Sequence, residues 1–275
     1  MFNKLSSVCV FAILISFLCN SCGKKGISQL EKKEKFSLPP EDFDLVWSDE
    51  FDGNKLDLTK WFYRANGPRR DAINTPDAIS IDTVNGTLKI SNYLKDDKIY
   101  TGMIGSVIQR DQRYGYFECR AKIYPINKSF WPAFWLQSHS YGKTMDPVKD
   151  GMEIDIMETF FGDPKFLSHA IHWNGYAENK QSVGQNTYSE TFNDDIYHTF
   201  ALEWLPTGYR FFIDNYLVWE LKSTDVPVSD ALQYIILSCE VGDKAEFVKL
   251  FGNKRVDFVV DYVRVYRWKG TDRLK

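Results

Sequence analysis

Short stretches in which apolar and polar side chains alternate recur along most of the chain. A period of two is typical of β-strands, and runs with the 3.6-residue period of a helix are scarce. Turn-forming pairs such as Asn85-Gly86 and Asp214-Asn215 separate the stretches. The predicted strands cover residues 78–84, 87–92, 115–124, 130–136, 153–159, 168–173, 197–204, 209–213, 216–221, 234–241 and 256–268. So many short strands predict an all-β sandwich.

The chain from residue 43 onward shows no break in composition and no internal repeat. We therefore predict one domain over residues 43–270. Its last strand, residues 256–268, is apolar on both faces (VDFVVDYVRVYRW), with Val256, Phe258, Val260 and Tyr262 on one of them. A strand of this kind is covered on both sides, so we place it inside a sheet rather than at an edge.

The first 22 residues have the pattern of a bacterial export signal. A lysine precedes an apolar run at residues 8–18, which is shorter than the roughly 20 residues needed to cross a membrane. Cys22 lies between Ser21 and Gly23, which resembles a lipoprotein signal with Cys22 as the lipidated residue. The alternative is an ordinary secretory signal. The first interpretation predicts a cell-envelope protein that is lipid-anchored to a bacterial membrane, facing the periplasm or the outer surface.

Residues 23–42 are polar and lysine-rich and contain Pro39-Pro40. This composition predicts a polar tether that lifts the domain off the membrane. Its lysines are suited to contacts with anionic lipid headgroups.

Composition narrows the class of protein further. The chain has 275 residues, 44% of them apolar, and a net charge of −3, which excludes a disordered chain and offers no basic face for nucleic acid. Aromatic residues make up 16%, and such rings stack on flat ligands such as sugar faces. Cys119 and Cys239 are the only cysteines after the leader. We expect them to be buried and unpaired, and their spacing predicts no zinc site.

The segment GMEIDIMET, residues 151–159, carries three acids. On a regular strand Glu153 and Asp155 share a face, whereas Glu158 would point into the core, where an unpaired carboxylate is costly. A β-bulge at Ile156-Met157, with Met157 as the extra residue, returns Glu158 to the face of the other two.

That geometry predicts a pair of catalytic carboxyl groups. Glu153 and Glu158 would then lie about 13 Å apart along the backbone, and side chains leaning together reach the ~5.5 Å separation of a retaining glycosidase. Asp155 lies between them. The alternative is a solvated strand face with three acids. The tryptophans at residues 131, 135, 173 and 204 favour a polysaccharide cleft instead.

At this point the chain resembles glycoside hydrolase family 16, the laminarinase and lichenase group, whose active-site signature in its bulged form is E-I-D-I-x-E. Further segments carry the likeness: residues 46–53 (VWSDEFDG), 115–122 (GYFECRAK), 131–136 (WPAFWL), 198–204 (HTFALEW) and 261–266 (DYVRVY). The resemblance implies a β-jelly-roll of two curved antiparallel sheets with an open cleft. It also implies retaining endo-hydrolysis, with Glu153 as nucleophile, Asp155 as electrostatic helper and Glu158 as acid/base.

The same resemblance suggests residues for substrate binding. Trp131, Trp135, His172 and Trp173 would line the sugar subsites, together with Arg64 and Asn66 from the early loop. No cofactor is required. Some relatives bind a structural calcium near the chain termini, and Asp261 with the backbone of Asp52-Gly53 is the candidate here.

Three segments depart from the laminarinase pattern, namely residues 102–108, the loop at residues 64–70, with three arginines, and residues 238–243 (SCEVGD). Agarases, carrageenases and porphyranases share the bulged signature, and arginines suit anionic sugars. The predicted substrate is therefore a β-1,3- or mixed-linkage glucan, with a marine galactan as the alternative. A third possibility is a non-catalytic carbohydrate-binding lipoprotein on the same sandwich. We expect a monomer.

Overall fold

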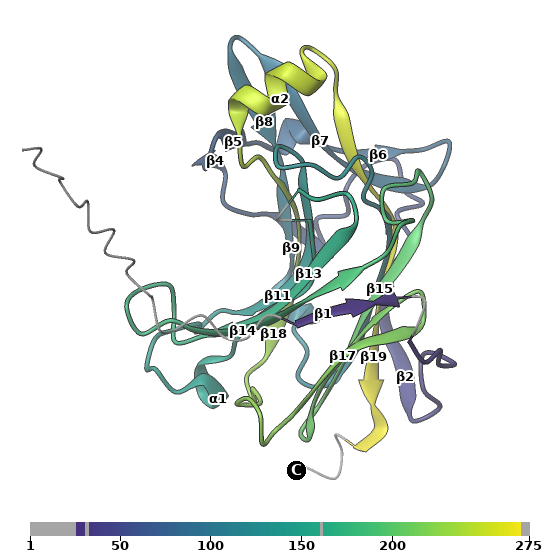
Figure 1. Cartoon of the computed structure of the whole chain (residues 1–275), viewed down its shortest axis with the longest axis vertical. Coiled ribbons are helices and arrows are strands. Elements are labelled where there is room, and N and C mark those ends of the chain that lie inside the picture. The colour runs from purple at the N-terminus through teal and green to yellow at the C-terminus, as the bar shows by residue number, and fades with distance from the viewer. Residues whose placement is uncertain (1–25, 31–32, 160–161, 271–275) are drawn as a thin grey trace, which may run out of the picture.

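Two β-sheets packed face to face make up the computed structural model, which describes residues 26–30, 33–159 and 162–270. Both sheets are strongly curved (Figure 1). The eight-stranded sheet runs in the order β1 (Gly26–Gln29), β14 (Gln181–Tyr188), β13 (Phe166–Trp173), β12 (Glu153–Glu158), β11 (Trp131–Ser138), β18 (Gln233–Glu240), β9 (Met103–Ser106) and β3 (Trp61–Tyr63). We call it the cleft sheet.

The second sheet has eleven strands, and we call it the outer sheet. Its order is β17 (Tyr216–Lys222), β16 (Gly208–Ile213), β15 (His198–Leu205), β10 (Gly115–Lys122), β19 (Val256–Trp268), β7 (Thr87–Lys95), β8 (Lys98–Thr101), β5 (Ala72–Asn74) and β4 (Gly67–Arg69), with β2 (Phe43–Asp49) paired to β19 and β6 (Ile79–Asp82) paired to β7. The helices are α1 (Pro147–Asp150), α2 (Lys244–Phe251), and the 3-10 turns η2 (Pro76–Ala78) and η3 (Ile108–Arg110).

This architecture confirms the predicted jelly-roll sandwich. Every described strand pair is antiparallel except β1–β14 and β5–β8, which are parallel. The core lies between the sheets and is rich in aromatic rings: Trp204 of β15 stacks on Phe117 of β10, with ring centroids 6.2 Å apart. Both rings are fully buried. Residues that alternate with the core positions on the cleft sheet face away from the outer sheet and are available for binding.

Strand β19 lies inside the outer sheet between β10 and β7, as predicted. Its buried face changes part-way along. Val256, Phe258 and Val260 are buried at first, but Val263 and Val265 are buried afterwards. The pairing with β10 shifts by one residue between Val260 and Tyr262, so a second bulge at Asp261 causes the change. Simple alternation over residues 256–268 did not anticipate it.

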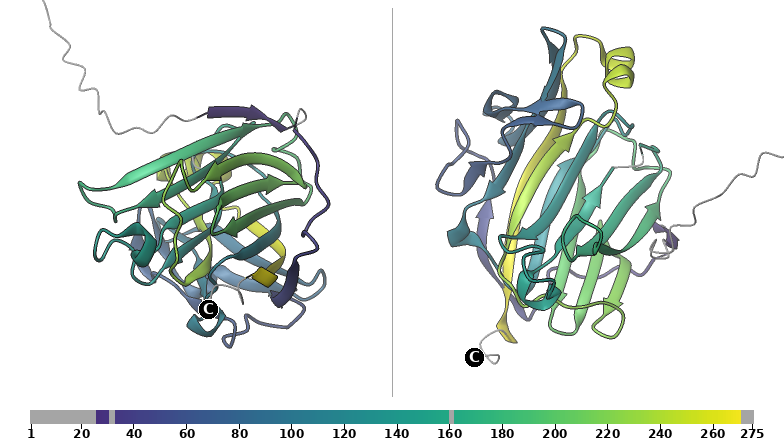
Figure 2. Two further views of the ribbon diagram at one scale, coloured as in Figure 1. Left: turned by 90° about the horizontal axis from the view of Figure 1, so that it is seen from below. Right: turned by 90° about the vertical axis from the view of Figure 1, so that its left-hand side faces the viewer.

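The N-terminal segment is docked on the sandwich, so the prediction of a free tether over residues 23–42 is wrong for its described part. β1 extends the cleft sheet beside β14 (Figure 2). Leu30 is buried, and the Phe36 ring packs edge-on against Phe212 at 5.8 Å. The backbone N–H of Phe36 also donates to the carbonyl of Asn215 at 2.8 Å. Scattered apolar residues among the lysines carry this docking. Residues 1–25, with Cys22, lie outside the described residues.

Two further observations concern the rest of the described chain. Cys119 and Cys239 are both buried with free thiols, as expected. No helix in the described ranges is long and apolar enough to cross a membrane.

Candidate active site

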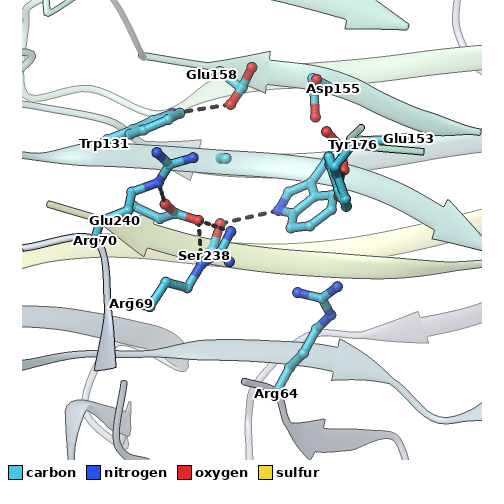
Figure 3. A pocket seen from close by; sticks show the side chains of 12 residues that line it. Arg64, Arg69, Arg70, Trp131, Glu153, Asp155, Glu158, Tyr176, Ser238 and Glu240 are labelled. Carbon is cyan, nitrogen blue, oxygen red and sulfur yellow. Dashed lines mark hydrogen bonds and ion pairs between the residues drawn. The ribbon is translucent and has the colours of Figure 1, made fainter. Parts of the chain in front are cut away.

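A bulge in β12 brings the three acids to one face of the cleft sheet. Against β11, Phe134 pairs with Met157 and Trp135 pairs with Asp155, so Ile156 is the residue without a partner. The predicted bulge is confirmed, but the extra residue is Ile156 rather than Met157. Ile154, Ile156 and Met157 are all buried in the main core. The register change leaves Glu153, Asp155 and Glu158 side by side on the cleft face (Figure 3).

Each carboxylate has its own hydrogen-bond or ion-pair partner. Glu153 accepts at Oε2 from Gln137 Nε2, at 2.9 Å, and from the Tyr176 hydroxyl. Asp155 Oδ2 lies 3.1 Å from His172 Nε2.

At the other end of the row, Glu158 Oε1 accepts from the indole N–H of Trp131 at 3.1 Å. Glu158 thus has the neutral indole of Trp131 on one side and the acids Asp155 and Glu153 on the other (Figure 3). Burial raises the pKa of Glu158 well above its usual range, and the charges of Asp155 and Glu153 raise it further. The Trp131 hydrogen bond opposes this rise. Glu158 is therefore poised to hold a proton, while Glu153 is held by hydrogen-bond donors.

The carboxylates line a cavity of about 310 Å³ on the cleft face. Trp131, Trp135 and Arg64 line it, in agreement with prediction. The other lining residues are Arg69, Arg70, Ala133, Glu153, Asp155, Glu158, Tyr176, Ser238 and Glu240. Alternation along β11 explains part of this set, because Trp131, Ala133, Trp135 and Gln137 share one strand face.

Three arginines line this cavity, and two of them, Arg64 and Arg70, lie over its aromatic rings. The Arg64 guanidinium lies 5.0 Å from the Trp135 ring centroid and donates to Gln137 Oε1 at 2.8 Å. Arg70 lies 4.5 Å from the Trp131 ring centroid. Arg69 and Arg70 both pair with the carboxylate of Glu240. Cations thus cover ring faces on which a neutral sugar would stack.

A second hollow of about 430 Å³ continues the cleft past Tyr176. Tyr176, in the loop after β13, lines both spaces. His139 and Tyr234 form a stacked pair in the wall of the second hollow, with centroids 4.5 Å apart. Together the two hollows make an elongated surface rather than a closed pocket.

Several predicted binding residues have other surroundings. Trp173 packs against the main core and Asn66 is exposed on its loop, and neither lines the cavity. His172 reaches the site through Asp155. Sequence reasoning missed Gln137 and Tyr176. Gln137 could have been found, because alternation along the strand places it on the same face as Trp135. Tyr176 lies on an irregular loop, where no periodic pattern applies.

The proposed calcium ligand also has a different partner. Asp261, at the bulge of β19, forms an ion pair with Arg120. A carboxylate already neutralised by a guanidinium is a poor ligand for calcium, which prefers several oxygen donors. Within the described residues, the three-donor cluster is Glu153, Asp155 and His172, which belongs to the active site. The residues near Asp261 therefore do not fit the predicted structural calcium.

The raised pKa of Glu158 predicts how stability depends on pH. The folded state binds the Glu158 proton more tightly than the unfolded state does. The contribution of Glu158 to the free energy of unfolding is therefore fully present below about pH 4.5 and is lost as the pH rises through the pKa of Glu158 in the folded state. Glu158→Gln stays neutral and should avoid this loss. We expect this variant to match the stability of wild type near pH 4 and to be more stable than wild type at neutral pH.

Thermal unfolding followed by circular dichroism across this pH range measures the difference. Glu178→Gln, on the exposed loop after β13, is the matched control for removing one negative charge. A wild type and a Glu158→Gln variant whose melting temperatures differ by the same amount at every pH would contradict the assignment.

Comparisons with known proteins agree with this geometry. A family model described as the GH16 domain of β-porphyranases A–D matches residues 44–268. A β-glucanase of Rhodothermus marinus is 30% identical, over 82% of this chain and 86% of its own length. A keratan-sulfate endo-1,4-β-galactosidase of Sphingobacterium multivorum is 29% identical, and the match spans 82% of this chain but 56% of that protein. The laminarinase from Flavobacterium sp. UMI-01 superposes with a TM-score of 0.67 at 26% identity, covering 82% of this chain and all of that one. The chain belongs to glycoside hydrolase family 16.

Proposed function

We propose that this protein cleaves internal bonds of a β-linked polysaccharide with retention, using Glu153 as nucleophile and Glu158 as acid/base. The observation that carries the proposal is the bulge in β12. It places Glu153 and Glu158, the latter with a raised pKa, on one wall of the cleft. A pair of this kind is what double displacement at a sugar carbon requires.

The first step begins at Glu153. Both donors, Gln137 and Tyr176, bind Oε2, which leaves Oε1 to attack the anomeric carbon. The bond from that carbon to Oε1 forms as the glycosidic C–O bond breaks, and the Glu158 proton moves to the departing oxygen. Burial and the charge of Glu153 raise the pKa of the Tyr176 hydroxyl, so it remains a donor throughout.

The second step reverses the role of Glu158. Once Glu153 is esterified its negative charge is gone, which removes one cause of the raised pKa of Glu158. The ionised Glu158 then takes a proton from water, whose oxygen attacks the anomeric carbon and releases Glu153. Asp155, beside His172, still raises the pKa of Glu158 and so favours the return of the proton to Glu158.

Separate variants should distinguish the two roles. Glu153→Ala loses the covalent step, and added azide should restore activity with a product of inverted configuration. Glu158→Ala should lose about 100-fold or more on polysaccharide but little on aryl glycosides with good leaving groups, which need no acid. Product analysis by NMR and initial rates on both substrates test this. Equal losses on both substrates without azide rescue would overturn the assignment.

A β-1,3- or mixed-linkage glucan is the substrate we propose. The supporting observations are the match to the R. marinus β-glucanase, which spans most of both chains, and the likeness to a laminarinase. The continuous cleft formed by the two hollows suits attack within a chain.

An anionic galactan is the second candidate, and the arginines favour it. Arg64, Arg69 and Arg70 line the cavity, and Glu240 pairs with only two of them. Guanidinium groups bind sulfate esters through paired hydrogen bonds. The family model built on β-porphyranases supports the same candidate.

Release of reducing ends from laminarin, lichenan, agar, porphyran and carrageenan decides between these substrates. We expect the highest rate on laminarin or lichenan. In that case Arg69→Ala should change kcat/KM by less than about threefold, because surface ion pairs contribute little. Activity restricted to a sulfated galactan and lost on Arg64→Ala would establish the second candidate. A wild type that binds these polymers but releases no ends would indicate a carbohydrate-binding protein.

We further propose that residues 1–22 are a lipoprotein signal, that Cys22 carries the lipid, and that the protein is anchored to a membrane of the cell envelope. The support is the short apolar run followed by Ser21-Cys22-Gly23. Because the described chain is docked from residue 26 onward, few residues separate Cys22 from the sandwich.

Metabolic labelling with a fatty-acid analogue tests the anchor. Wild type should be labelled and recovered with membranes, and Cys22→Ala should be unlabelled. Cys19→Ala is the matched control and should label like wild type. Full labelling of Cys22→Ala, or an unlabelled wild type, would rule out the anchor.

A further inference from the structure

His169 is a fully buried titratable residue that the catalytic steps do not use. It lies on β13, the strand beside the bulge. Its neighbours Ser168 and Ala170 pair with Glu158 and Asp155, so His169 alone stands opposite Ile156 and Met157. A histidine therefore occupies the one position where two residues of β12 face one residue of β13.

Both ring nitrogens of His169 are used. Nδ1 lies 2.7 Å from the carbonyl oxygen of Ile156, and Nε2 lies 2.9 Å from the hydroxyl of Thr187 on β14. A carbonyl only accepts, so Nδ1 carries the hydrogen, and the neutral ring then accepts at Nε2 from Thr187. Burial lowers the pKa of His169 to about 4, which keeps the ring neutral. Thr187 is also fully buried.

The contact replaces bonding that the bulge interrupts. A bulge disrupts the regular ladder and leaves its extra residue unpaired. Ile156 is that residue, and a buried carbonyl without a donor is costly. The ring of Phe211, from the outer sheet, packs 5.7 Å from the His169 ring and holds it from the core side.

We propose that His169, supported by Thr187, is a positioning residue that fixes the β12 bulge and thereby aims Glu158 at the leaving-group oxygen. This inference rests on the proposed function of Glu158. Glu158 follows the clamped carbonyl by two residues, whereas Glu153 precedes it and has its own donors, Gln137 and Tyr176. Loosening the clamp therefore affects proton transfer more than nucleophilic attack.

The experiment compares polysaccharide, which needs the acid, with an aryl glycoside of the same sugar, which does not. His169→Leu removes both hydrogen bonds. We expect kcat on polysaccharide to fall about 10- to 100-fold with KM within about twofold, and the aryl rate to fall less than about threefold. His169→Asn keeps an amide N–H near the position of Nδ1 and should recover most of the loss. Thr187→Val should fall between the two.

Ile171→Val is the matched control, since it removes one methylene from a buried residue of the same strand. It should leave both rates unchanged below its melting temperature. Equal losses on the two substrates, or a folded His169→Leu with wild-type rates, would overturn the proposal. If His169→Leu does not fold, Thr187→Val and His169→Asn provide the test. A ratio of polysaccharide rate to aryl glycoside rate equal to that of wild type in both variants would also overturn the proposal. A wild type inactive on every substrate would instead refute the proposed function.

Discussion

A β-strand presents successive side chains to opposite faces, and this constraint governs the active site. Three acids at positions 153, 155 and 158 cannot share a face of a regular strand. One extra residue in β12 resolves the conflict and keeps Ile154, Ile156 and Met157 in the core. The bulge breaks the regular ladder, and a side chain, His169, lies within hydrogen-bond distance of the carbonyl of the extra residue. Catalytic geometry and core packing thus depend on the same irregularity.

Three carboxyl groups in one cavity repel one another when they are ionised. Each of them has a different hydrogen-bond or ion-pair partner. Glu153 accepts from two hydrogen-bond donors, and a histidine lies beside Asp155. Glu158 has one neutral donor and two negative neighbours, so its proton is retained. The difference between the two glutamates comes from their neighbours, because both belong to one short strand. That asymmetry supports the proposed roles of Glu158 as general acid and Glu153 as nucleophile.

The fold and the three carboxylates could be predicted because alternation and the cost of a buried charge are local rules. The bulge at Asp261 was not predicted, because regular alternation over residues 256–268 placed no charged side chain in the core and so gave no indication that the buried face changes. The docking of residues 26–30 and 33–42 was not predicted, because the polar composition of the segment hides a few apolar contacts such as Phe36 on Phe212. Tyr176 reaches Glu153 from an irregular loop, and only the tertiary structure determines where such a loop leads.

Chemistry and specificity have separate origins in this molecule. The catalytic residues are fixed by register in the cleft sheet, where a shift of one residue would turn every side chain over. The arginines come from residues 64–70, which connect β3 to the β4–β5 hairpin at the margin of the outer sheet. Arg64 and Arg70 contact the partners of the β12 carboxylates, since Arg64 donates to Gln137 and Arg70 lies on Trp131. Arg69 pairs with Glu240, so its substitution alters the charge of the cleft without removing a contact to those partners. The charge that the cleft presents to a substrate is therefore set by a different part of the chain from the strand that carries the three carboxylates.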